Sequence, residues 1–150
     1  MAGVLLLLSQ PFAAATGTAK TVWERITFKP AGVWVLAERA DSPEKRSRGL
    51  MFRSSLRERD AMIFYFDEAA YQTFWMFNTR IPLTVIFLDD GLRVVDMKNM
   101  APCPEKNAEL CPTYTSQGLA RYAIEVNQGF VGKYDIKVGD RVTIERASGH

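Results

Sequence analysis

The 150-residue chain is 47% hydrophobic, which suits one ordinary folded domain and is too short for two. Its 19 lysines and arginines stand against 17 aspartates and glutamates, and the net charge of +2 excludes the strongly basic surface of a dedicated nucleic-acid-binding protein. We therefore expect a single core and no nucleic-acid partner.

The first 15 residues, MAGVLLLLSQPFAAA, have the pattern of an export signal. They carry no charge and place an apolar run before Ala13, Ala14 and Ala15, small residues that signal peptidase accepts. The usual basic first segment is missing and Pro11 interrupts the run, so a greasy N-terminal strand or a disordered tag is the alternative. The run is far short of the roughly 20 residues that cross a bilayer. We expect a signal peptide over residues 1–15, a single β-rich domain over 16–150, no transmembrane span, and a periplasmic or secreted location.

Alternating, β-branched and aromatic residues predict strands along most of the chain. A turn at Pro30, Ala31 and Gly32 separates the first two. The run LTVIFL is apolar on both faces, which predicts a central strand covered on both sides. Asp90 and Gly91 predict a tight type I′ hairpin turn after it. The predicted strands are 21–28, 33–39, 62–66, 74–77, 83–89, 93–97, 122–127 and 141–145.

One helix has clear start and stop signals. Ser42 can cap it, Pro43 suits its first position, Glu44 favours its positive end, and Gly49 can end it. A second short helix or turn is expected within residues 129–135. About eight strands with one or two short helices predict a mostly β fold, a small antiparallel β-sandwich or barrel.

The two cysteines, Cys103 and Cys111, lie in the proline-rich loop APCPEKNAELCPTY, where a covalent link can substitute for missing secondary structure. A redox-active pair is more often spaced C-x-x-C, and a structural zinc site needs further ligands that one terminal histidine does not supply. We predict a structural disulfide between these cysteines, and hence an oxidising compartment.

The sequence offers little for covalent catalysis. The only histidine is His150 at the terminus, so a nucleophile has no base of the usual kind beside it. The common phosphate-binding glycine motifs are absent, and we expect no metal or other cofactor. A carboxylate pair can cleave glycosides without histidine, and Asp89 and Glu125 are the candidates. Their structural alternatives are a turn-forming aspartate and a solvated acid on a strand with one wet face.

The stretch KRSRGLMFRSSLRER holds six basic residues around an apolar centre. Guanidinium groups bind carboxylate, phosphate or sulfate in a bidentate manner, although most of these side chains fit a solvated helix face. Arg48 and Arg53 flank the apolar centre and are the two we select as candidate ligand-binding residues.

The segment FWMFNTRIPL, residues 74–83, passes directly from apolar to hydrogen-bonding side chains. Asn78 and Thr79 can simply satisfy backbone groups where the strand ends before Pro82. Alternatively, Trp75 and Met76 form the floor of a binding pocket whose specificity comes from Asn78 and Thr79. The residues alone favour the structural reading modestly.

Six motifs follow one another along the chain: RGLMFRSSL (48–56), MIFYF (62–66), FWMFNTRIPL (74–83), IFLDDG (86–91), APC with CPTY (101–114), and YAIEVNQG with KVGD (122–140). In this order they resemble the motifs of the domain-of-unknown-function family 192 (DUF192). This resemblance implies a small, often exported or lipid-anchored bacterial protein with a jelly-roll-like β fold, and no established reaction or cofactor. The chain departs from the family where a usual lysine is Phe77, a usual aspartate is Thr84 and a usual glycine is Ala61. The matching polar positions are Arg48, Arg53, Asn78, Thr79, Glu125 and Asn127.

Three functional hypotheses follow from these observations. The first is an exported, non-catalytic binding or accessory protein of the cell envelope, whose partner is a small ligand, a glycan or an envelope protein. The second is a hydrolase that cleaves a saccharide with Glu125 and Asp89. The third is a purely structural domain.

Overall fold

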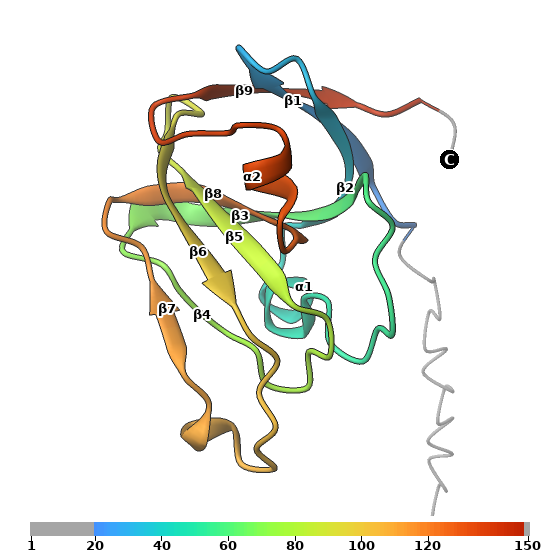
Figure 1. Cartoon of the computed structure of the whole chain (residues 1–150), viewed down its shortest axis with the longest axis vertical. Helices are drawn as coiled ribbons and strands as arrows, with labels where there is room; N and C mark the ends of the chain where they lie inside the picture. The colour runs from blue at the N-terminus through green and yellow to red at the C-terminus, as the bar shows by residue number, and fades with distance from the viewer. Residues whose placement is uncertain (1–19, 149–150) are drawn as a thin grey trace, which may run out of the picture.

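Figure 1 shows the computed structural model of the chain, in which residues 20–148 are described. The mostly β fold and the short helix after Ser42 are confirmed, whereas the predicted signal peptide, residues 16–19 of the predicted domain and His150 lie outside the described residues. In chain order the elements are β1 (Trp23–Lys29), β2 (Trp34–Ala40), α1 (Pro43–Arg48), β3 (Asp60–Ala70), β4 (Thr73–Trp75), β5 (Leu83–Leu88), β6 (Val94–Met100), the 3-10 helix η1 (Ala108–Leu110), β7 (Thr113–Thr115), β8 (Ala120–Asn127), α2 (Phe130–Lys133) and β9 (Arg141–Arg146).

The main sheet has seven strands in the order β6-β5-β8-β3-β2-β1-β9, and it curls strongly (Figure 1). Its two edge strands meet at one end, where Arg93 and Arg141 form an antiparallel bridge and the Val142 N–H donates to the Leu92 carbonyl at 2.9 Å. The sheet therefore approaches a closed barrel, as predicted. One neighbour pair departs from the predicted antiparallel arrangement: β2 and β3 are parallel, because the chain crosses back through α1 between them.

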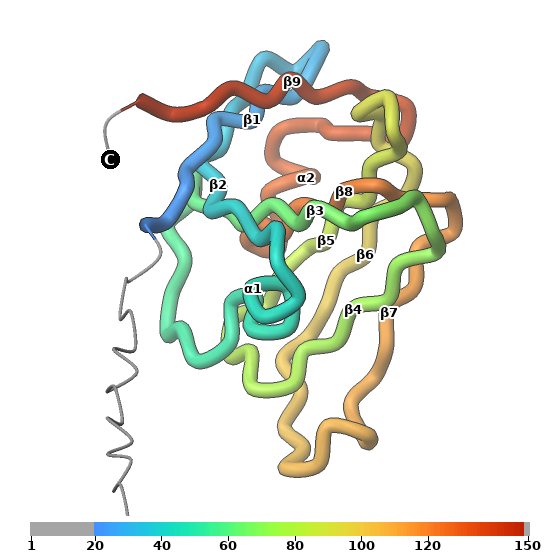
Figure 2. The backbone as a smooth tube through the Cα atoms, turned by 180° about the vertical axis from the view of Figure 1, so that it is seen from behind, coloured from blue at the N-terminus to red at the C-terminus, as the bar shows by residue number. Residues whose placement is uncertain are grey.

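Two hydrophobic cores lie on opposite faces of this sheet. The inner core fills the curl and includes Phe130 of α2, whereas the outer core lies beneath α1, β4 and β7. Figures 1 and 2 show α2 on one side of β3 and β8 and α1 on the other. All six residues of β5 are buried, Val85 in the outer core and Ile86 in the inner one, which confirms the prediction for LTVIFL.

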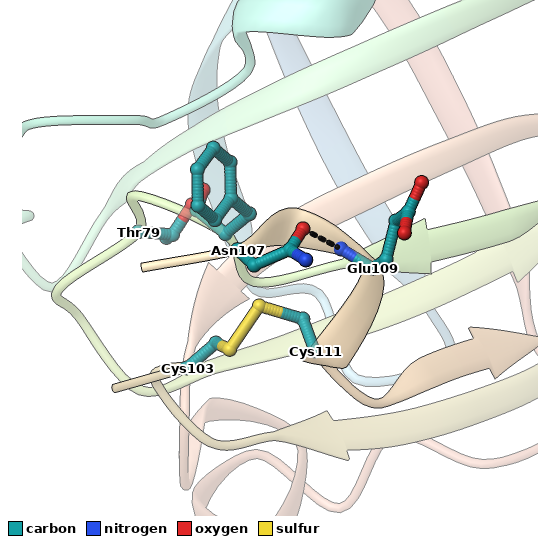
Figure 3. The surroundings of a disulfide bond; sticks show 6 residues. Thr79, Cys103, Asn107, Glu109 and Cys111 are labelled. Carbon is teal, nitrogen blue, oxygen red and sulfur yellow. Dashed lines mark hydrogen bonds between the residues drawn. A yellow bond between two sulfur atoms is a disulfide. The ribbon is translucent and has the colours of Figure 1, made fainter. Parts of the chain in front are cut away.

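A two-stranded sheet, β4 with β7, covers part of the outer core. Strand β7 was not predicted, because three residues are too few to show an alternating pattern. The predicted disulfide joins Cys103 and Cys111 in the connection that leads into β7 (Figure 3). Between them the Asn107 side chain accepts a hydrogen bond from the Glu109 N–H at 3.1 Å and caps η1. The disulfide thus closes a loop whose only regular structure is one turn of helix.

The predicted two-residue turn at Asp90 and Gly91 is wrong. Asp89 and Arg93 close a three-residue loop through a hydrogen bond from the Asp89 N–H to the Arg93 carbonyl at 3.0 Å. The left-handed conformation falls on Leu92, whose φ is 59°. This arrangement, in which the third loop residue is left-handed, is the common three-residue alternative to a type I′ hairpin.

The helices are short. The Ser42 side chain accepts a hydrogen bond from the Lys45 N–H at 3.2 Å, so the predicted cap of α1 is confirmed. Within residues 20–148, none of the helices has the length and apolar character needed to cross a membrane.

Candidate functional site

A pocket of about 260 Å³ opens on the outer face of the sheet, between α1, β3 and β4. We call it the α1 pocket. Glu125 of β8 lines it together with aromatic residues of β3 and β4 and the end of α1. Its lining residues are Arg46, Ser47, Arg48, Gly49, Leu50, Met51, Phe64, Phe66, Thr73, Phe74, Trp75, Thr79 and Glu125.

The parallel crossover from β2 to β3 positions α1 over this face. The helix ends at Gly49, whose φ of 47° and ψ of −134° suit a residue without a Cβ atom. The Gly49 N–H donates to the Lys45 carbonyl at 2.9 Å, and the next residue, Leu50, is only 1% exposed in the outer core. Burial of Leu50 therefore fixes the end of α1 above the sheet.

A second contact ties the crossover to the turn after β4. Phe52 and Asn78 both have left-handed backbone, with φ of 66° and 54°. The Phe52 N–H donates to the Asn78 carbonyl at 2.8 Å. Left-handed backbone is costly for a bulky residue such as Phe52 and persists only where the surrounding structure enforces it. Asn78 thus acts through its backbone, and its side chain does not line the α1 pocket.

Aromatic side chains form one wall of the pocket. Phe74 contacts Phe64 and Phe87 edge-on, with ring centroids 5.0 Å and 5.6 Å apart, a favoured aromatic arrangement. Trp75 is 42% exposed and packs against Phe77 with ring centroids 5.8 Å apart. The pocket therefore has a wall of packed aromatic rings, and a half-exposed tryptophan is among its lining residues.

Glu125 is the buried polar group of the pocket. Glu125 is 5% exposed as a whole residue, and its cross-strand neighbours, Met62 of β3 and Val85 of β5, are both apolar. Its carboxyl makes no hydrogen bond to any described residue, and yet no fully enclosed side-chain oxygen or nitrogen among those residues lacks a partner. The carboxyl oxygens must therefore reach the pocket space. Burial raises the pKa of Glu125 to about 8, so the group is mainly protonated at pH 7.

Two arginines of α1 line the pocket, and they differ in whether the guanidinium has a partner among the described residues. Arg46 is held in place, because Nη1 donates to the Tyr65 carbonyl at 2.8 Å and the guanidinium lies 6.0 Å from the Phe66 ring. Arg48 is exposed, and its guanidinium makes no hydrogen bond or ion pair with any residue that the structure describes. Arg48 is consequently the cation at this site that is free to meet a ligand.

Of the eight predicted binding residues, the α1 pocket brings together Arg48, Trp75, Thr79 and Glu125. Thr79 is buried at 7% exposure, and its hydroxyl donates to the Phe77 carbonyl at 3.3 Å. Whether these four residues bind a ligand stays a prediction at this point.

The other four lie outside the α1 pocket for identifiable reasons. Arg53 forms a two-pronged ion pair with Glu38, including an Nη2 to Oε2 contact of 2.8 Å. Met76 is 1% exposed in the outer core, so it is not the pocket floor that the sequence suggested. Asn127 donates through Nδ2 to the carbonyls of Leu56 at 2.8 Å and Arg57 at 3.1 Å, and it secures the connection before β3. Asn78 lies in the turn after β4, where its carbonyl accepts the hydrogen bond from the Phe52 N–H.

The carboxylate pair proposed for a hydrolase does not fit. Glu125 is opposite Val85, and Asp89 lies four residues further along, so the backbone positions are about 13 Å apart at 3.3 Å per residue, and Asp89 does not line the pocket. Glycoside cleavage needs about 5 to 9.5 Å between its carboxyl groups. The Asp89 carboxylate instead accepts hydrogen bonds from the Gly91 and Arg93 N–H groups, both at 2.9 Å. Asp89 is therefore a turn residue.

Phe77 and Thr84, where the chain departs from the family pattern, do not line the α1 pocket either. Thr84 is 1% exposed, and its hydroxyl donates to Asn99 Oδ1 at 2.7 Å. Neither departure thus contributes a lining side chain to this pocket, although Phe77 packs against the lining residue Trp75.

The lining residues that sequence reasoning missed include Arg46, Phe64, Phe66 and Phe74. Phe64 and Phe66 share one face of β3 by simple alternation, which is a signal that could have found them. No such signal links Arg46 to Phe74, because the crossover brings them together. Within residues 20–148, no group of three or more histidine, cysteine, aspartate or glutamate side chains is placed to hold a metal ion.

A curled β sheet with an aromatic pocket around a buried acid defines a small barrel-like protein with a cavity of ligand size. The sequence profile of the family DUF192, described as Uncharacterized ACR, COG1430, matches residues 26–144. The chain therefore belongs to this family.

Relatives and a solved structure agree with this assignment. A UPF0127 protein of Thermococcus gammatolerans is 31% identical over 106 residues, which cover 71% of this chain and 64% of the relative. The chain thus spans less than two thirds of that relative's length. A UPF0127 protein of Pyrococcus horikoshii is 32% identical over 108 residues, which cover 69% of this chain and 82% of the relative. The crystal structure of a protein of unknown function from Novosphingobium aromaticivorans is similar, with a TM-score of 0.71 and 29% identity over 90% of this chain and 93% of that one.

Proposed function

We propose that this protein is a non-catalytic binding protein that takes a small ligand into the α1 pocket. The observation that supports this best is Glu125, a residue only 5% exposed, whose carboxyl has no partner among residues 20–148 and opens into the pocket. An unpaired buried carboxyl weakens a fold, and such a group is retained most readily where a ligand supplies its partner. The aromatic wall with a few polar groups is the usual composition of small-ligand sites.

The protein is also proposed to work outside the cytoplasm, in the cell envelope. Two features support this location: the signal-like residues 1–15 and the Cys103–Cys111 disulfide, a bond that persists in oxidising compartments. Expressed with its leader in a bacterium, the protein should appear in the periplasmic fraction without residues 1–15 and without free thiols. A full-length, fully reduced protein in the cytoplasmic fraction would refute the location.

The binding role can be tested by a thermal-shift screen of the purified protein against sugars, cell-wall fragments, organic anions, amines and amino acids. A ligand at about 100 times its dissociation constant adds close to 2.7 kcal/mol, which raises the melting temperature by several degrees. Glu125→Gln should lose this shift. Glu68→Gln is the matched control, because Glu68 is exposed on β3 and does not line the pocket.

Two results would contradict the binding role. One is the absence of any shift across the whole screen together with a Glu125→Gln variant that differs only in stability. The other is a ligand that shifts the wild type and Glu125→Gln equally, which would place its site elsewhere. The purely structural role predicts the first of these results.

A further inference from the structure

Few charged groups surround Glu125, and they differ in whether they are free to bind a ligand. The strands on either side contribute Met62 and Val85, which are apolar, and β4 contributes aromatic residues and Thr73. The remaining charged side chains that line the pocket are Arg46 and Arg48, both from α1. Arg46 is turned to the Tyr65 carbonyl, so an arriving ligand meets one buried acid and one unpaired guanidinium, that of Arg48.

We propose that the α1 pocket binds a small zwitterion, whose ammonium nitrogen pairs with Glu125 and whose acidic group pairs with Arg48. This inference rests on the proposed function and names the class of ligand that the same site would take.

The ammonium end of the ligand follows from the surroundings of Glu125. An ionised carboxylate at this depth needs a countercharge, and no described side chain provides one. Phe74 and Trp75 line the same pocket, and aromatic rings attract ammonium groups. A cationic nitrogen therefore gains both from the acid and from the aromatic wall.

The positive charges of the two arginines on α1 are the reason to expect an acidic group at the other end of the ligand. A plain amine would meet two like charges on α1, whereas a carboxylate on the same molecule forms a paired hydrogen-bonded contact with the guanidinium of Arg48. The pocket volume of about 260 Å³ limits the molecule to the size of an amino acid or a small betaine. A smaller cavity than the roughly 300–1,000 Å³ of drug-sized sites suits such a ligand.

Pairing with an ammonium group requires Glu125 to release its proton, and this makes the proposal measurable. Because burial holds the pKa of Glu125 near 8, affinity should rise about tenfold per pH unit between pH 6 and 8 and level off above. A ligand that instead accepts a hydrogen bond from the neutral acid should bind equally well at pH 6 and 7 and lose affinity above pH 8.

The experiment is calorimetric titration at pH 6, 7, 8 and 9 with free amino acids and small betaines. Trimethylglycine carries a permanent positive charge that does not titrate in this range. Its matched controls are 3,3-dimethylbutyrate, which has the same shape and carboxylate but no cation, and choline, which has the cation but no carboxylate. Measurements in two buffers of different ionisation enthalpy count the protons released.

The proposal expects a zwitterion of this panel to bind with release of about one proton per ligand at pH 7, and with no release at pH 9. Glu125→Gln should abolish the pH dependence and weaken binding at least tenfold. Arg48→Ala should weaken zwitterions at least tenfold and leave the weaker binding of choline nearly unchanged. Glu68→Gln should match the wild type.

The proposal would be overturned if 3,3-dimethylbutyrate or another plain carboxylate bound more tightly than the zwitterions, or if no zwitterion bound. In either case a hit of another class that Glu125→Gln loses would leave the proposed binding function intact. If no compound of any class bound, both statements would fail together.

Discussion

Raising the pH from 4.5 to 8 is expected to lower the free energy of unfolding through Glu125 by about 4 kcal/mol, since the slope reaches 1.36 kcal/mol per pH unit only well inside this range. Burial raises the pKa of this carboxyl from 4.5 in the unfolded chain to about 8 in the folded one. Between these values the folded state holds a proton that the unfolded state has lost, so stability is highest below pH 4.5 and falls as the pH rises towards 8.

The change approaches the lower end of the net stability of small domains, which is about 5 to 15 kcal/mol. Urea unfolding at pH 5, 6, 7 and 8 measures it. Glu125→Gln removes the titrating group and should therefore flatten the difference curve, whereas Glu68→Gln should follow the wild type. A wild type and Glu125→Gln variant whose stabilities run in parallel from pH 5 to 8 would show that Glu125 titrates normally in the fold.

The other acidic groups whose pKa is shifted do not titrate between pH 5 and 8, where the effect of Glu125 is measured. Hydrogen bonds from Lys45 and Lys133 lower the pKa values of Asp41 and Glu58, whose stabilising effect therefore fades on acidification, below the window. Burial and the hydrogen bond to Glu24 raise the pKa of Tyr65 above its usual value, so this group titrates above the window. Of the described acids whose pKa is shifted, Glu125 is therefore the one that determines how the free energy of unfolding changes between pH 5 and 8.

Removing the disulfide is expected to cost about 2.5 kcal/mol, from the chain entropy of the short loop that it closes. The two cysteines are eight positions apart, and the connection between them leads into β7, which pairs with β4. Because β4 carries Trp75 into the α1 pocket, loss of the disulfide should also weaken any ligand bound there. Unfolding in urea of Cys103→Ser/Cys111→Ser at pH 6 measures the stability change.

Reduced wild-type protein is the control for this prediction. Cys111 is 7% exposed, so its replacement by serine also buries a hydroxyl group, whereas reduction alone does not. Reduction should therefore lower stability by slightly less than the double substitution. If reduced and oxidised protein unfolded at the same urea concentration, the disulfide would have no stabilising role.

The strands and the disulfide were predictable because their signals are local. Alternation marks the long strands, LTVIFL marks the buried centre, and Ser42 marks the start of α1. Pairing is not local: periodicity does not show that β2 and β3 run in parallel, or that β7 pairs with β4. The left-handed position at Leu92 was missed because composition favoured Gly91.

The candidate site was only half predictable for the same reason. Strand β4 ends at Trp75, so alternation no longer applies to Met76 and Asn78, which lie in the core and in a turn. For Glu125, the default expectation of a wet outer face failed because α1 and β4 cover that face. Arg48 lines the pocket, and its binding role stays a prediction, whereas nothing in the sequence showed that Arg53 would pair with Glu38.

The central claim is that Glu125 is a buried, unpaired acid that opens into a ligand pocket. Carbon-13 NMR of the protein labelled at glutamate side-chain carboxyls tests it most directly, with the Glu125 signal assigned by its loss in Glu125→Gln. The account predicts that this signal titrates with an apparent pKa near 8. A Glu125 signal that titrates near 4.5, like an exposed glutamate, would contradict the account.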